Sequence, residues 1–335
     1  LANDIGLIAI INNNELTGFN IAIGGGLSTT HGNPLTYARL ATVIGYVPAG
    51  EWTLKAVYAI ATIQRDFGNR SDRKLARLKY TVDRHGIPWF KEEIERRIGY
   101  QLEKARPYDF TERKDYYGWA KDAQGLWFYT PFVENGRILD DEKVALKSAL
   151  LAIAKTGKAN FRFTGNQNLI LADIPPQDKP LIDKILLEFG LISYTEKISS
   201  LRKNSIACVA FNTCPLALAE AQRYLPSLID KIEPLLQKHS LSEEEIILRM
   251  TGCPNGCARP YVAEIGFVGT AYGFYNLHLG GDRQGTRLNK VYKENLDENA
   301  ILSTLDDVFG LYKTERLQNE TFGDYSNRRF FDSAN

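Results

Sequence analysis

Four cysteines form two pairs within a stretch of fifty residues, Cys208 with Cys214 and Cys253 with Cys257. A chain of 335 residues can bury a core that folds without disulfide bridges, so the cysteines are better explained as thiolate ligands. Structural zinc usually takes cysteines about two to four residues apart, which suits the second pair better than the first. Iron–sulfur clusters also use four thiolates and accept wider spacing. The spacing therefore favours a cluster and leaves zinc open.

The residues beside the cysteines have properties that a ligand site needs. Pro215 follows Cys214 and opens an apolar-periodic segment, which predicts a helix from Pro215 to about residue 237. The N-terminus of that helix would direct free N–H groups and partial positive charge at Cys214. Pro254, Asn255 and Gly256 are turn residues between the second two cysteines. Their N–H groups can point at sulfur, so Asn255 is a candidate cofactor-binding residue.

A basic segment lies far from the cysteines in the sequence. Residues 62–84 contain seven basic and three acidic side chains. The spacing of Arg70, Arg73 and Arg77 predicts that they share one face of a helix. Guanidinium groups pair with carboxylates or phosphates through two parallel hydrogen bonds, so this face, together with Lys79, is a candidate anion-binding surface. A solvated helix surface is the alternative explanation.

The overall composition restricts the classes of partner. Lys and Arg number 41 against 40 Asp and Glu, which gives a formal net charge of +1. This balance argues against a general electrostatic attraction to nucleic acid or to an anionic membrane. No apolar run of about 18 residues is present, so we expect no transmembrane span. Gly24-Gly25-Gly26 lacks the Rossmann spacing and no P-loop sequence occurs, which argues against nucleotide binding.

Hydrophobic patterns predict an α+β fold in three regions, residues 1–118, 119–192 and 193–335. The middle region has the order β-α-β-β-α-β, which is typical of a ferredoxin-like half-unit. The third region carries all four cysteines. The expected elements are a hairpin of strands 5–11 and 18–23, helices between 51 and 100, strand 125–133, helix 141–156, strands 159–164 and 167–173, helix 178–189, a strand near 192–195, a linker at 197–205, strands near 246–250, 261–268 and 274–279, and a helical tail.

Several motifs resemble those of the sirohaem sulfite/nitrite reductases. Both cysteine motifs do so, in the stretches that begin at Cys208 and at Met250. The likeness covers nearly the whole chain and includes residues 18–27, 64–74, 164–170 and 275–281. The resemblance implies a portion of a sirohaem-binding α+β domain at 1–118, a ferredoxin-like half-domain at 119–192 and a 4Fe-4S-binding α/β domain at 193–335.

The resemblance also assigns roles to single residues. It implies that the four cysteines bind a 4Fe-4S cluster and that Cys257 is also the axial ligand of the sirohaem iron, so Cys257 is the expected catalytic residue. Sirohaem carries many carboxylates, which makes Arg70, Arg73, Arg77 and Lys79 candidates for binding them. The implied reaction is the six-electron reduction of sulfite to sulfide.

The same likeness suggests an NADPH-oxidising flavoprotein as electron donor, a place in cysteine biosynthesis and a cytoplasmic location. A ferredoxin-dependent sulfite or nitrite reductase would keep the chemistry with another donor or substrate. A zinc-stabilised binding protein without redox activity is the alternative from a different class. The chain begins with Leu-Ala-Asn-Asp, without Met or a signal-peptide pattern. In the family the substrate-gripping half lies upstream, so we expect a C-terminal portion that is inactive alone.

Overall fold

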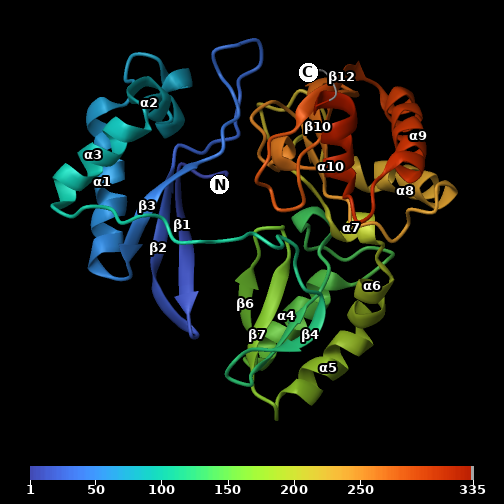
Figure 1. Cartoon of the computed structure of the whole chain (residues 1–335). Helices are drawn as coiled ribbons and strands as arrows, with labels where there is room; N and C mark the ends of the chain where they lie inside the picture. Colours follow the sequence, from blue (N-terminus) through green and yellow to red (C-terminus); the bar gives the residue numbers. More distant parts are fainter. Residues whose placement is uncertain (333–335) are drawn as a thin grey trace.

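The computed structural model describes residues 1–332, which form three regions with separate hydrophobic cores. In Figure 1 the N-terminal region (blue) lies beside the C-terminal region (orange and red), and the middle region (green) lies below the latter. A small fourth cluster joins the first and third regions, with Leu27 packed against Tyr261, Val262 and Val268. The N-terminal segment around Leu27 therefore touches the region that carries the cysteines.

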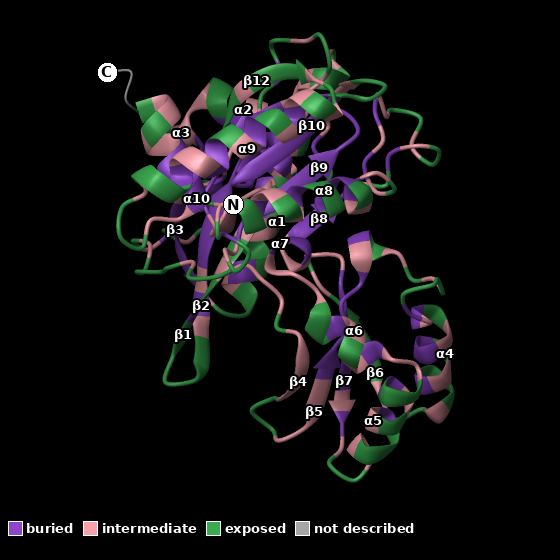
Figure 2. Ribbon diagram, turned by 90° about the vertical axis from the view of Figure 1, so that its right-hand side faces the viewer, coloured by how far each residue is buried: buried purple, intermediate pink, exposed green. Residues whose placement is uncertain are grey.

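The N-terminal region is an antiparallel sheet covered by helices. Strands β1 (Ile5–Asn12) and β2 (Glu15–Ile23) form the predicted hairpin, and β3 (Thr42–Pro48) gives the order β1-β2-β3. Figure 2 shows the hairpin tip as exposed. Ile21 and Ile23 of β2 and Val47 of β3 are buried against the helices. These helices are α1 (Glu51–Phe67), α2 (Leu78–His85) and α3 (Ile87–Ile98).

The prediction that Arg70, Arg73 and Arg77 share one helical face is wrong. Helix α2 begins only at Leu78, and the preceding residues form bends and one 3-10 turn. Local side-chain bonds explain this, because Asn69 Oδ1 accepts the N–H groups of Ser71 and Asp72, both at 3.0 Å. Such bonds offer the backbone an alternative to a helix.

The middle region is a four-stranded antiparallel sheet in the order β4-β5-β7-β6. Two predictions here are wrong. A strand before 125–133 was missed, and the segment near 192–195 is helical, because Leu191 is fully buried against the sheet in a short helix. The elements are β4 (Gly118–Lys121), β5 (Trp127–Thr130), α4 (Leu146–Thr156), β6 (Asn160–Phe163), β7 (Leu169–Ile174), α5 (Lys179–Glu188) and α6 (Leu191–Lys197).

The C-terminal region is a mixed five-stranded sheet in the order β12-β11-β10-β9-β8. The first two pairs along the chain, β8 with β9 and β9 with β10, are parallel, whereas the other two are antiparallel. Strand β12 was missed by the sequence prediction, and the expected linker contains α7 and the start of β8. The elements are α7 (Ser200–Lys203), β8 (Ser205–Ala207), α8 (Leu225–Lys238), β9 (Leu248–Thr251), β10 (Ile265–Ala271), β11 (Phe274–Leu279), β12 (Lys290–Leu296), α9 (Glu298–Glu315) and α10 (Phe322–Asn327).

The helix predicted from Pro215 is also wrong in its first part. Helix α8 begins at Leu225, so the segment after Cys214 is irregular and no helix N-terminus directly follows this cysteine. The backbone N–H groups of Leu218 and Ala219 donate to the carbonyl of Gly252, at 2.7 and 2.9 Å. These two N–H groups are therefore not available for the hydrogen bonds of a continuous helix.

Candidate functional site

The two cysteine loops leave the same edge of the C-terminal sheet. Strands β8 and β9 are parallel neighbours, with Ala207 paired to Met250. Cys208 follows β8 directly, and Cys253 follows β9 after one glycine. The carboxyl ends of parallel strands meet at one edge, where open sheets commonly bind ligands. The fold therefore brings together two pairs that are distant in sequence.

Backbone contacts lock the two loops against each other. The N–H of Cys208 donates to the carbonyl of Met250 at 3.0 Å, and the N–H of Gly252 donates to the sulfur of Cys208 at 3.3 Å. A Cβ at Gly252 would lie only 2.4 Å from the carbonyl oxygen of Ala219. Glycine is therefore required where the loops cross.

All four cysteines are free thiols that interact electrostatically. Burial raises the pKa of Cys208, and the nearby Cys257 and Cys253 raise it further. Burial likewise raises the pKa of Cys253, to which Cys257 and Cys214 add. Backbone N–H groups act in the opposite direction at both sulfurs, including that of Asn255 at Cys253. The predicted thiolate set is thus brought together, with Cys253 buried and Cys257 exposed.

The donor set suits a polynuclear sulfur-ligated centre. Four thiols with N–H groups directed at two of the sulfurs are the ligands that iron–sulfur clusters use. Within residues 1–332, no three His, Cys, Asp or Glu side chains are grouped as a single metal ion would require.

Lys79 is enclosed by the protein. Its Nζ donates to the carbonyls of Gly26 at 3.0 Å and Ser28 at 2.8 Å, and also to that of Tyr37. An ammonium group has three donors, and three carbonyls accept them. Burial lowers the pKa of Lys79 to about 8. The structure therefore places Lys79 as a support for the loop between Gly26 and Tyr37, with no donor left for a cofactor carboxylate.

The three predicted arginines have different surroundings. Arg77 pairs with Asp4 at 2.7 Å and lies against Gly26, where a Cβ would be 2.8 Å from the guanidinium carbon. Arg70 is exposed and donates to the backbone carbonyls of Gln64 and Arg65. Arg73 is exposed in the 3-10 turn. Arg70 and Arg73 remain accessible to an anion, whereas Arg77 already has a carboxylate partner.

A buried group of arginines was missed by the sequence reasoning. Arg113, Arg249 and Arg259 converge where the middle and C-terminal regions meet, and Arg249 and Arg259 both donate to Asn166 Oδ1, at 3.2 and 3.3 Å. Burial, and then Arg259 and Arg113, lower the pKa of Arg249 well below its usual value. In the described part of the chain, Arg249 Nε and Nη1 have no hydrogen-bond partner. The three arginines are separated by up to 146 positions in the sequence, which explains why no local pattern revealed the group.

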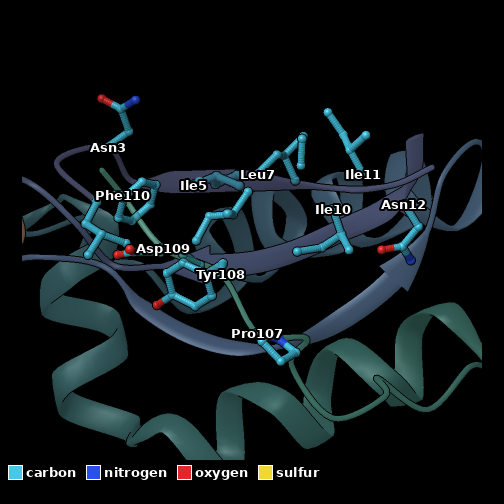
Figure 3. A pocket seen from close by; sticks show the side chains of 15 residues that line it. Asn3, Ile5, Leu7, Ile10, Ile11, Asn12, Pro107, Tyr108, Asp109 and Phe110 are labelled. Carbon is cyan, nitrogen blue, oxygen red and sulfur yellow. The ribbon is translucent and has the colours of Figure 1, made fainter. Parts of the chain in front are cut away.

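A groove of about 650 Å³ runs along the unpaired edge of β1, away from the cysteines. Figure 3 shows Ile5, Leu7 and Ile11 along β1, with Tyr108 below the strand and Phe110 beside Ile5. None of the four cysteines lines this groove. Among residues 1–332, no helix combines the length and the apolar character needed to cross a bilayer.

The structure combines a four-stranded antiparallel sheet with a second sheet that presents four thiols, and two family models describe parts of this chain. Residues 1–102 match the family described as nitrite and sulphite reductase 4Fe-4S domain, and residues 120–189 match the nitrite/sulfite reductase ferredoxin-like half domain. The chain belongs to the nitrite and sulfite reductase family. All four cysteines lie outside both matched ranges.

Similar proteins include NADPH sulfite reductase hemoprotein beta-components. The protein of that name from Leptospira biflexa is 63% identical over 97% of this chain and 59% of its own length. The one from Escherichia coli is 53% identical over 98% of this chain and 57% of its own. The solved structure of Mycobacterium tuberculosis NirA aligns with a TM-score of 0.80 at 26% identity, covering 97% of this chain and 60% of NirA. The chain thus spans 57–60% of the length of these relatives. The structural match to NirA confirms the predicted α+β fold class.

Proposed function

We propose that the protein to which this sequence belongs reduces sulfite to sulfide, using a 4Fe-4S cluster and sirohaem. The observation that carries the proposal is the convergence of four free thiols from two loops at one sheet edge. The likeness to NADPH sulfite reductase hemoprotein beta-components supports the choice of substrate.

Cys208, Cys214, Cys253 and Cys257 would hold the cluster. Cys257 is the exposed member of the set, which supports its proposed second role as a residue that would also hold the sirohaem iron. When bound, the cluster and the tetrapyrrole would supply electrons one at a time to the substrate. The chain's own residues would fix the thiolates and aim N–H groups at Cys208 and Cys253. Asn255 would act through its backbone N–H.

Anionic groups of sirohaem would meet basic side chains of the N-terminal region. Arg70 and Arg73 are exposed and support this role, since their guanidinium groups can pair with carboxylates. Arg77 would contribute charge while paired with Asp4. The enclosure of Lys79 by three carbonyls argues for an indirect role.

We extend the proposal to organisation and partners. Three separate cores support three domains with a first boundary near 118. Tyr194 of α6 still packs on the middle core, which favours a second boundary after Lys197 over the one expected at 192. An NADPH-oxidising flavoprotein would donate the electrons, in the cytoplasm, as part of cysteine biosynthesis. The name shared by the relatives supports the NADPH-linked donor over ferredoxin.

The test is made on the full-length protein, purified without added metal. We expect iron and acid-labile sulfide, a visible spectrum containing tetrapyrrole bands, and sulfite-dependent oxidation of a reduced viologen dye. Nitrite as the preferred substrate, or ferredoxin as the only competent protein donor, would support the related reductases. A colourless protein that contains zinc and no iron would overturn the proposal.

A further inference from the structure

The carbonyl oxygen of Pro254 connects the second cysteine loop to the N-terminal region. The backbone N–H and the Oγ1 of Thr29 both donate to this oxygen, each at 3.0 Å. The hydroxyl of Tyr261 donates to it at 2.7 Å, and the two hydroxyl oxygens are 3.2 Å apart. One carbonyl between two cysteines is therefore held by Thr29, which lies 225 positions away, and by Tyr261.

The other side of the same peptide unit faces a sulfur. The C=O of Pro254 and the N–H of Asn255 belong to one planar group, and in a trans peptide they point in opposite directions. The N–H of Asn255 is directed at the sulfur of Cys253, two residues earlier in the same loop. Holding the carbonyl thus fixes the direction of the N–H toward sulfur, and hydrogen bonds in series strengthen one another.

Tyr261 can hold the carbonyl because its ring is fixed. The side chain is 7% exposed and packs with Leu27 and Val268. Gly256 makes room for it, since a Cβ there would lie 2.7 Å from the ring and the glycine has a φ of +67°. His278 meets the ring edge to face, with 5.4 Å between the centroids. The hydroxyl therefore has little freedom to leave Pro254.

Thr29 is held from its own side of the contact. Lys79 binds the carbonyls of Gly26 and of Ser28, the residue immediately before Thr29. The N–H of Thr30 donates to Thr36 Oγ1 at 2.8 Å and fixes the other flank. A continuous set of contacts therefore runs from the buried Lys79 through Thr29 and Pro254 to the sulfur of Cys253.

We infer that Thr29 and Tyr261 are positioning residues that set the reduction potential of the cluster through the Pro254–Asn255 peptide. The inference rests on the proposed function, because it requires a cluster bound by Cys253. N–H groups directed at sulfur stabilise the reduced cluster, which carries the additional negative charge, and so they raise its potential. Removing either hydroxyl loosens the peptide and lowers the potential.

The experiment is a redox titration of the full-length protein with its cofactors bound. Electron paramagnetic resonance follows the reduction of the cluster. Thr29→Val and Tyr261→Phe remove only a hydroxyl from similar shapes. We expect each to reduce the equilibrium constant for cluster reduction about threefold, or about 28 mV for one electron on the scale of about 59 mV per tenfold. The double variant shows the largest shift, and Thr29→Ser retains the original potential.

Tyr37→Phe is the matched control. Tyr37 lies on the same N-terminal loop as Thr29. Its hydroxyl donates to Asp83 at 2.7 Å and not to the cysteine loop. We expect this variant to keep the wild-type potential. An unchanged potential in the double variant, or an equal shift in Tyr37→Phe, would overturn the inference while the proposed function stood. If the wild-type protein contained no iron, that result would contradict the proposed function itself, whatever the variants show.

Discussion

The Nζ of Lys79 lies 2.8 Å from the carbonyl oxygen of Ser28, although the two residues are 51 positions apart. The side chain of Lys79 is fully buried and also reaches the carbonyls of Gly26 and Tyr37. A lysine that the sequence suggested for cofactor binding thus organises a loop, and the loop in turn contacts the cysteine region through Thr29.

Replacing Lys79 with Met should destabilise the chain. Met keeps most of the volume but leaves three carbonyls without their donor, and a buried unsatisfied polar group costs about 1–3 kcal/mol. Relief of the buried charge offsets part of this cost, so we expect a net loss of about 2 kcal/mol in the free energy of unfolding, measured with urea. Lys74→Met changes an exposed lysine of the same segment and should stay within about 0.5 kcal/mol. Equal values for both variants would contradict the supporting role of Lys79.

Cys257→Ser should affect both metal centres of the full-length protein. The hydroxyl is a poor substitute for the thiolate, so we expect loss of the cluster signal together with a change in the tetrapyrrole bands. Replacing a residue that only orients a ligand typically lowers activity by about tenfold to hundredfold. We expect a larger fall in sulfite-dependent activity for Cys257→Ser, because the ligand itself is lost. Cys214→Ser is the comparison, since only the cluster role is proposed for it. Unchanged tetrapyrrole bands in Cys257→Ser would refute a shared ligand.

Glu264 should make stability depend on pH. Its side chain is fully buried, accepts the N–H groups of Ile247 at 2.9 Å and Gly323 at 2.8 Å, and has a pKa that burial raises to about 7. The folded state therefore holds this proton more tightly than the unfolded state does. Its contribution to stability is present below about pH 4.5 and is lost as pH rises through about 7.

The measurement compares wild type with Glu264→Gln by urea unfolding at several pH values. Glutamine does not titrate, so the stability of the wild type relative to the variant should fall by about 2–3 kcal/mol between about pH 5 and pH 8. Other groups titrate equally in both proteins and cancel in this difference. A constant difference across the range would show that Glu264 keeps an ordinary pKa.

Two buried arginines should respond in opposite ways to replacement by Met. Arg249 faces two other arginines and lacks partners for two of its nitrogens, so Arg249→Met should be neutral or stabilising. Arg202 pairs with three carboxylates, those of Glu134, Asp230 and Glu233, and Arg202→Met should cost about 3 kcal/mol. Thermal and urea unfolding of both variants provide the check, and a larger loss in Arg249→Met would contradict the expected order.

Local patterns were sufficient for some elements of the fold. The hairpin β1–β2 is confirmed, because apolar runs flank a polar turn, and β11 runs over the expected 274–279. Long-range bonds explain the main errors. Ala219 donates its N–H to Gly252, which lies 33 positions later, and this prevents a helix that the apolar spacing alone would favour.

The candidate site shows the same division. The fold brings together the four cysteines that the spacing singled out, and their role as ligands stays a prediction. The direction of Lys79 could not be predicted, because the carbonyls that bind it belong to a loop about fifty residues earlier. The shared contact of Thr29 and Tyr261 with the Pro254 carbonyl could not be predicted, because neither segment contains a sequence motif for it.

The parallel pairing of β8 with β9 has a consequence for biogenesis. Cys208 and Cys214 emerge from the ribosome about forty residues before Cys253, and α8 must form the crossover before the second loop can join them. Until then the early thiols have no complete set of partners. A site with all four thiols therefore exists only once β9 has paired with β8.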